Sequence, residues 1–144
     1  MIPKSGNRFS DKIMPQQSTD RSDAPHFPRP APIDAYGNGG FAFADMSHRG
    51  SLLCLPQGIW AWPITRAAQI DEASLERVFA GASEIDTLIV GTGMDVWTPS
   101  RALRESLRQV QIVLDPMQTG PAIRTYNIMM GERRRVAAAL IAVP

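Results

Sequence analysis

Two glycine-containing loops carry the residues of this chain that could best bind a ligand or a partner. Gly91-Thr92-Gly93 follows the apolar run from Ile85 to Val90, and residues 117–120 follow a second apolar run, Ile112 to Leu114. If these runs are parallel strands, both loops lie at the carboxyl edge of one sheet, where open α/β sheets usually bind their ligands. The sequence therefore predicts a functional edge formed by these two loops.

The second loop opens a predicted helix with polar side chains. Thr119 and Gly120 stand at its start, where free N–H groups and the positive end of the helix dipole suit an anion. Arg124 and Asn127 lie about 60° apart around the same helix and could form a polar recognition pair. Their other interpretation is a solvated helix face with a surface hydrogen bond.

Two aspartates complete the candidate site. Asp95 and Asp115 each follow a predicted strand, and paired carboxylates can do acid–base work or hold a metal. Two loop aspartates are also a common coincidence, so we predict no catalytic residue. The predicted ligand- or partner-binding residues are Gly91, Thr92, Gly93, Asp95, Asp115, Thr119, Gly120, Arg124 and Asn127.

The chain lacks the patterns that a cofactor or a metal requires. The dinucleotide fingerprint that Gly91-Thr92-Gly93 begins would place its last glycine where Val96 stands. His26 and His48 have no second ligand at metal spacing. We therefore expect no cofactor and no metal site, and the absence of a catalytic set favours a binding protein over an enzyme.

The elements that position this site belong to one domain. The chain has 144 residues, and residues 1–32 contain half of its twelve prolines without any apolar periodicity. Such a segment cannot bury enough apolar surface to offset its ordering entropy. We expect a disordered tail over 1–32 and a single α/β domain over 33–144.

The first half of this domain reads as an antiparallel meander. Apolar strands are predicted at Phe41–Phe43, Ser51–Leu55 and Ile59–Trp62, with turns at 37–40 and 47–50. Gly37-Asn38-Gly39-Gly40 is turn chemistry, because glycine and asparagine tolerate positive φ.

The second half alternates helix and strand. A helix capped by Asp71 precedes the strand Ile85–Val90, and a helix with Thr98 as N-cap precedes the strand Ile112–Leu114. The helix that Thr119 is expected to cap precedes a last strand over 136–143. This β-α-β-α-β order implies parallel strands, and with the meander it predicts a layered α/β fold with a mixed central sheet.

Composition limits the environment and the partners. The single cysteine, Cys54, excludes an intramolecular disulfide, which fits a reducing compartment. A formal net charge of +1 does not suit non-specific nucleic-acid binding, and no apolar stretch is long enough to span a membrane. The N-terminus also lacks the apolar stretch of a secretory signal. We expect a cytoplasmic protein.

A row of arginines on one predicted helix could place the protein at a membrane surface. Arg101, Arg104 and Arg108 line one face of a predicted helix. They could dock to an acidic protein or a membrane surface, or form an ordinary solvated face.

Four blocks in order resemble a known family. They are residues 34–41 (DAYGNGGF), 50–53 (GSLL), 85–93 (IDTLIVGTG) and 119–127, with Thr119-Gly120 and Arg124-Thr125-Tyr126-Asn127. This combination resembles the MTH-type domain-of-unknown-function family, small α/β proteins typified by a methanobacterial structural-genomics protein, over about 33–143. Pro121 and Ile123 depart from the pattern, since small residues or cysteine would be expected there, and this argues against thiol chemistry.

The resemblance implies a function as well as a fold. Eukaryotic members include a mitochondrial respiratory complex I assembly factor, which works beside the inner membrane through protein partners, and the family has no established catalytic residues. We therefore expect a non-enzymatic binding or assembly-type protein whose partner could belong to membrane-associated respiratory or translocation machinery. The alternative is a binder of, or enzyme for, an anionic small molecule at the edge formed by Gly91–Gly93 and 119–127.

Overall fold

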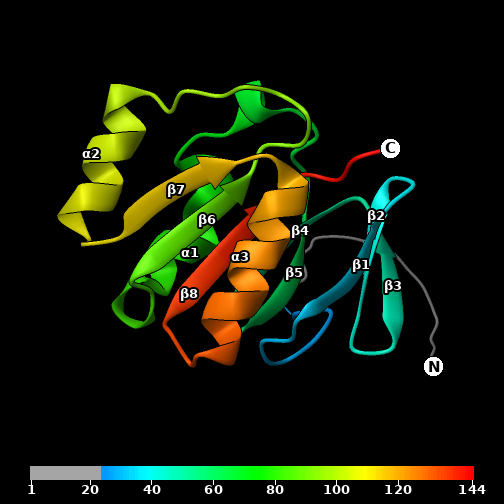
Figure 1. Ribbon diagram of the computed structural model, residues 1–144. Coiled ribbons are helices and arrows are strands. Elements are labelled where there is room, and N and C mark those ends of the chain that lie inside the picture. The colour runs from blue at the N-terminus through cyan, green and yellow to red at the C-terminus, as the bar shows by residue number, and fades with distance from the viewer. Residues whose placement is uncertain (1–23) are drawn as a thin grey trace, which may run out of the picture.

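The computed structural model describes residues 24–144, which fold around two β-sheets (Figure 1). The strands are β1 (Ile33–Gly37), β2 (Gly40–Phe43), β3 (Met46–Arg49), β4 (Ser51–Leu55), β5 (Gly58–Trp62), β6 (Thr87–Gly91), β7 (Val113–Met117) and β8 (Val136–Leu140). The α-helices are α1 (Glu76–Ala80), α2 (Arg101–Gln109) and α3 (Thr119–Gly131).

The larger sheet is mixed and has the order β5-β4-β8-β6-β7. β6 pairs in parallel with both β7 and β8, whereas β4 pairs antiparallel with β8 and β5. The predicted α/β fold with its β-α-β-α-β second half is confirmed. The smaller sheet, β1-β2-β3, is antiparallel.

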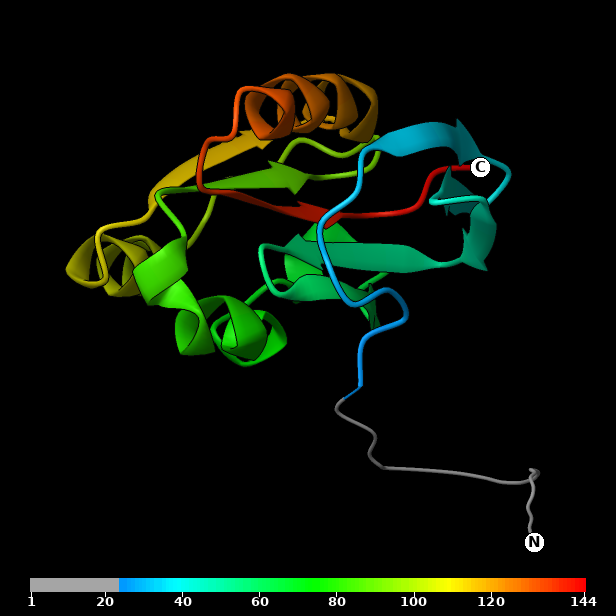
Figure 2. The same ribbon diagram turned by 90° about the horizontal axis from the view of Figure 1, so that it is seen from below.

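Helices cover both faces of the larger sheet (Figure 2). Alternate residues of β6 belong to two separate cores: Leu88 and Val90 pack with α1 and α2, and Ile89 packs with α3 and the smaller sheet. The central strand β8 is Val-Ala-Ala-Ala-Leu and is buried throughout. Its small side chains let layers on both faces approach the sheet closely, so α3 lies directly over the strands that carry the predicted edge.

The first half differs from the predicted meander. β4 and β5 belong to the larger sheet, and residues 47–50, expected as a turn, lie mostly within β3. β2 and β3 form a hairpin whose turn consists of Ala44 and Asp45, and both residues have positive φ. Alanine rarely adopts this conformation, so the local residue types did not indicate a turn there.

Helix and strand boundaries also differ from the predicted ones. Ser100, not Thr98, caps α2, because its hydroxyl accepts a hydrogen bond from the N–H of Leu103 at 3.1 Å. The helix expected after Asp71 is a short 3-10 turn followed by α1, and Asp71 accepts a hydrogen bond from the N–H of Ser74. β7 continues to Met117, beyond the predicted end at Leu114.

Part of the expected tail contacts the domain. The N–H of Phe27 donates to the carbonyl of Ile59 in β5, and the N–H of Ile59 donates back at 2.9 Å. Ordered contacts therefore begin before Ile33. The rest of the expected tail, 1–23, lies outside the described residues.

Candidate functional site

A buried hydrogen-bond network joins the two predicted loops. The hydroxyl of Thr119 accepts a hydrogen bond from the N–H of Gly93 at 2.9 Å and donates one to the carbonyl of Ile141 at 2.7 Å. Thr119 is fully buried, and its own N–H donates to the carbonyl of Gly93. Thr119 therefore does not cap α3 as predicted, because its side chain ties the start of α3 to the ends of β6 and β8.

The glycines of the first loop allow this close approach. A Cβ on Gly91 would lie 3.1 Å from both Cα of Thr119 and a methyl of Leu140, and Gly93 has a φ of +75°. Thr92 between them is buried, and its hydroxyl donates to the carbonyl of Asp95 at 2.8 Å. The small residues that the sequence singled out thus serve the packing of α3 on the sheet, and their polar atoms bond internally.

An open groove lies beside this network, between β1 and α3. We call it the β1–α3 groove; it has a volume of about 440 Å³ and is lined by Ile33, Asp34, Ala35, Tyr36, Gly120, Ile123, Arg124 and Asn127. Three predicted site residues, Gly120, Arg124 and Asn127, come together here.

Asn127 has a structural task in the groove. Its side-chain amide donates to the carbonyl of Ile33 and its oxygen accepts from the N–H of Ile33, both at 2.9 Å. The amide acts like a neighbouring strand and holds β1 against α3. Arg124 is exposed one turn earlier and is the charged side chain of α3 that lines the groove.

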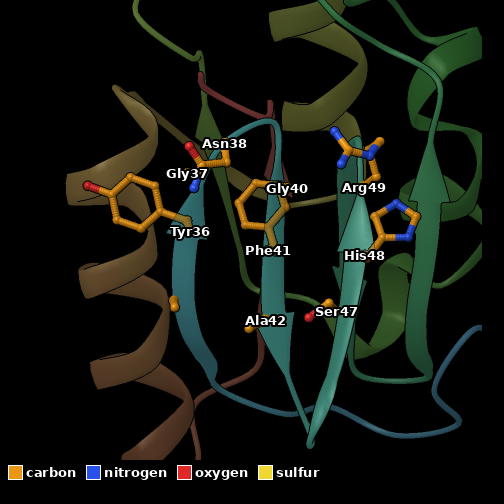
Figure 3. Close-up of a pocket in the computed structure, with 10 residues that line it drawn as sticks. Tyr36, Gly37, Asn38, Gly40, Phe41, Ala42, Ser47, His48 and Arg49 are labelled. Atoms are coloured by element: carbon orange, nitrogen blue, oxygen red, sulfur yellow. The ribbon is translucent and has the colours of Figure 1, made fainter.

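Tyr36 is a residue that sequence reasoning missed. Figure 3 shows its ring pointing from β1 toward α3. A Cβ on Gly120 would lie 2.5 Å from the Tyr36 hydroxyl oxygen, so the hydroxyl rests on the first turn of α3. The available signal was its place just before the Asn38-Gly39 turn, since a short hairpin fixes the direction of the flanking residues.

The same hairpin turns backbone groups of Tyr36 toward the groove. Asn38 and Gly39 both have positive φ, as in a type I′ turn, so Gly37 and Gly40 form the hydrogen-bonded closing pair. In an antiparallel ladder the next pair is not hydrogen-bonded, and the N–H and C=O of Tyr36 point away from β2. The groove therefore offers main-chain donors and acceptors beside a guanidinium.

The two predicted aspartates do not line this groove. Asp95 forms an ion pair with Arg66 at 3.4 Å in the loop after β6. We expected Asp115 to follow its strand. It lies instead inside β7, opposite Ile89, because β7 continues through Pro116 to Met117. Within residues 24–144, no three His, Cys, Asp or Glu side chains gather in a way that could hold a metal ion.

The single cysteine lies below the groove, in the core shared by α3 and the sheet. Cys54 is fully buried, and this burial raises the pKa of its thiol to about 12. The thiol therefore stays protonated and inert near neutral pH.

Comparison with known proteins gives the family. Residues 33–141 match the family described as "Protein of unknown function (DUF498/DUF598)". The chain belongs to the DUF498/DUF598 family. A mouse relative, named NADH dehydrogenase (ubiquinone) 1 alpha subcomplex assembly factor 3, is 28% identical over 144 residues, which cover 99% of this chain and 78% of the mouse protein.

Solved structures similar to this chain share its fold. The Rpa2829 protein of Rhodopseudomonas palustris is 69% identical with a TM-score of 0.74, over 88% of this chain and 94% of that chain. A Bordetella pertussis protein, described as a Mth938-like domain, is 27% identical with a TM-score of 0.68, over 89% of this chain and 92% of that chain. The resemblance that the four sequence blocks predicted is thus confirmed.

Within residues 24–144, no helix has the length and apolar character that crossing a bilayer requires.

Proposed function

We propose that this DUF498/DUF598 protein is a non-enzymatic assembly-type protein that holds a protein partner in the β1–α3 groove. The observation that carries the proposal is the groove itself, which combines outward-facing main-chain groups of Tyr36 with the exposed guanidinium of Arg124. Main-chain groups beside a charged side chain suit an extended peptide segment with an acidic residue. The name of the mouse relative, an assembly factor, supports the same class of role.

Seven of the nine predicted site residues divide into two roles in this proposal. Gly120, Arg124 and Asn127 form the groove with Ile33–Tyr36. Gly91, Thr92, Gly93 and Thr119 support it from the sheet, because they fix the first turn of α3. Asp95 and Asp115 fall outside the groove and take no part.

An anionic small molecule fits this surface less well. It would use the free N–H groups at the start of α3, yet the Tyr36 hydroxyl already rests on Gly120. Pro121 also lacks an N–H, which removes one donor from that turn. A ligand there would have to displace the tyrosine ring.

The partner class follows from the relative. We propose a subunit or assembly intermediate of a membrane-associated respiratory complex, met from the cytoplasmic side. The exposed arginines Arg101, Arg104 and Arg108 of α2 would serve as a secondary contact with an acidic surface.

Affinity capture from native lysate tests the proposal. The tagged chain should recover a stoichiometric protein after crosslinking, and Arg124→Glu should lose it, since charge reversal repels an acidic segment. Arg133→Glu makes the same charge change at an exposed residue that does not line the groove, and should retain the partner. Equal capture by Arg124→Glu and the parent would overturn the groove assignment.

A ligand screen separates the alternative. Thermal-shift measurements with phosphates, nucleotides and carboxylates should leave the melting temperature unchanged. A stabilising compound whose effect disappears in Arg124→Ala would replace the partner proposal with a small-molecule site.

A further inference from the structure

The two sheets have four edge strands: β5 and β7 are blocked, and β1 faces α3 across the groove described above. Phe27 pairs with Ile59 along β5, the other edge of the larger sheet carries Asp115 and Pro116 in β7, and Asn127 occupies the N–H and C=O of Ile33 in β1. Bound segments, charges and prolines are the devices by which proteins stop their edges from pairing with other chains.

The fourth edge, β3, has no proline, and within residues 24–144 no bound segment covers it; its one charged side chain is that of Arg49 at its end. β3 pairs only with β2, and within residues 24–144 no other backbone segment bonds to its outer side. Its register with β2 is regular from Met46 to Arg49. β3 is therefore an open pairing edge.

The hairpin geometry shows which groups β3 presents. Ala44 and Asp45 both have positive φ, so Phe43 and Met46 are the hydrogen-bonded closing pair of a type I′ turn. The alternation of an antiparallel ladder then directs the N–H and C=O of Ser47 and Arg49 away from β2. Both residues are exposed.

The outer face beside this edge carries small side chains along one line across the three strands. Ala35, Ala42 and Ser47 are opposed across the three strands, and Figure 3 shows Ala42 and Ser47 next to each other. With Gly37 and Gly40 they line a shallow hollow of about 440 Å³. Small side chains here leave room for another strand to continue the sheet without a clash.

The opposite charges at the two ends of β3 indicate what kind of strand could pair with it. Asp45 precedes β3 and Arg49 ends it, both are exposed, and neither forms an ion pair within residues 24–144. When two copies of β3 run antiparallel about a two-fold axis at Ser47, the turn that carries Asp45 of each copy comes beside the end of β3 that carries Arg49 of the other. The edge is therefore complementary to itself.

We propose that β3 pairs with β3 of a second copy of this chain, so that the two smaller sheets form one continuous six-stranded sheet. Strands of four residues bury little surface, well below the roughly 1,200 Å² of a stable interface. The dimer is therefore weak and forms with increasing protein concentration.

Sedimentation velocity on the full chain, from micromolar to millimolar concentration, tests the proposal. The parent should shift from monomer to dimer, and Arg49→Glu should weaken the dimer about tenfold or more, because two attractive pairs become repulsive. The double variant Asp45→Lys/Arg49→Glu should restore dimerisation. Arg101→Glu controls for net charge and should behave as the parent.

A crosslinking experiment reads the register even if a charge variant folds poorly. Ser47→Cys should be joined to a second copy by a short bifunctional maleimide, since buried Cys54 does not react. The exposed control Ala102→Cys on α2 should remain monomeric under the same conditions. A parent that stays monomeric at millimolar concentration, or equal crosslinking of both variants, would overturn the proposal.

Discussion

At the residue scale, the hydroxyl of Thr119 joins three elements of the site. It bonds to the N–H of Gly93 and the carbonyl of Ile141 from a fully buried position. The sequence placed Thr119 and Gly93 at one edge correctly, because both follow apolar strands. It could not show that the hydroxyl faces inward, since that depends on how far β7 runs before α3 begins.

Thr119→Val should destabilise the fold by about 2–4 kcal/mol. The substitution keeps the shape but leaves a buried N–H and a buried carbonyl unpaired, at about 1–3 kcal/mol each. Chemical denaturation measures the change. Thr125→Val on the same helix, where the hydroxyl makes only a 3.7 Å contact with the Met117 sulfur, should cost less than about 1 kcal/mol. Equal losses in both variants would contradict the role of Thr119.

Tyr126 differs from Thr119, because its buried hydroxyl is not hydrogen-bonded within the described residues. Its ring is buried beside Cys54. Tyr126→Phe removes an unpaired buried polar group and keeps the ring, so we expect a protein as stable as the parent or about 1–2 kcal/mol more stable. Denaturation midpoints would show this, and a clear loss of stability would mean that the hydroxyl has a partner in solution.

At the element scale, the burial of each strand decided whether the sequence could predict it. Apolar periodicity revealed the buried strands β6 and β8 and the helices between them, because each faces a core. It did not reveal β1 and β3, since their small or polar residues lie on an exposed antiparallel sheet. The groove was therefore only half predicted: its α3 side was named, but Tyr36 and the β1 side were not.

β3 and the N-terminal segment meet at two histidines, and this contact should make stability depend on pH. The rings of His26 and His48 lie 5.1 Å apart. Burial, and secondarily the charge of His26, lower the pKa of His48 from 6.5. The folded chain therefore resists a proton that the unfolded chain accepts, and stability falls as pH drops below about 6.5.

Melting temperatures at about pH 7.5 and about pH 5.5 check this expectation. The parent should melt lower at the acidic pH, and His48→Gln should reduce the difference. Asp86, whose carboxyl pKa is lowered mainly by its hydrogen bond to Arg135, contributes only in more acidic solution, so it does not confuse the comparison. A pH dependence that His48→Gln leaves unchanged would assign the effect to other groups.

At the scale of the whole molecule, the packed core and the open groove are separate parts of the fold. The core between α3 and the larger sheet uses the conspicuous Gly-Thr-Gly loop for packing, and the groove beside it lies where the smaller sheet meets α3. Sequence patterns therefore pointed to the edge of the sheet beside which this groove lies, but they did not show that the polar atoms of the Gly-Thr-Gly loop bond internally. The contact between Tyr36 and Gly120 depends on the fold of most of the domain between them, which no local pattern encodes.

A photo-crosslinking amino acid at the groove tests the central claim most directly. p-Benzoylphenylalanine should replace Tyr36, which is 49% exposed in the groove, and in a control chain Val113, which is 64% exposed on β7. Illumination in native lysate should join the Tyr36-substituted chain to one defined protein and leave the Val113-substituted chain free. No adduct at Tyr36, or the same adducts from both positions, would contradict partner binding in the β1–α3 groove.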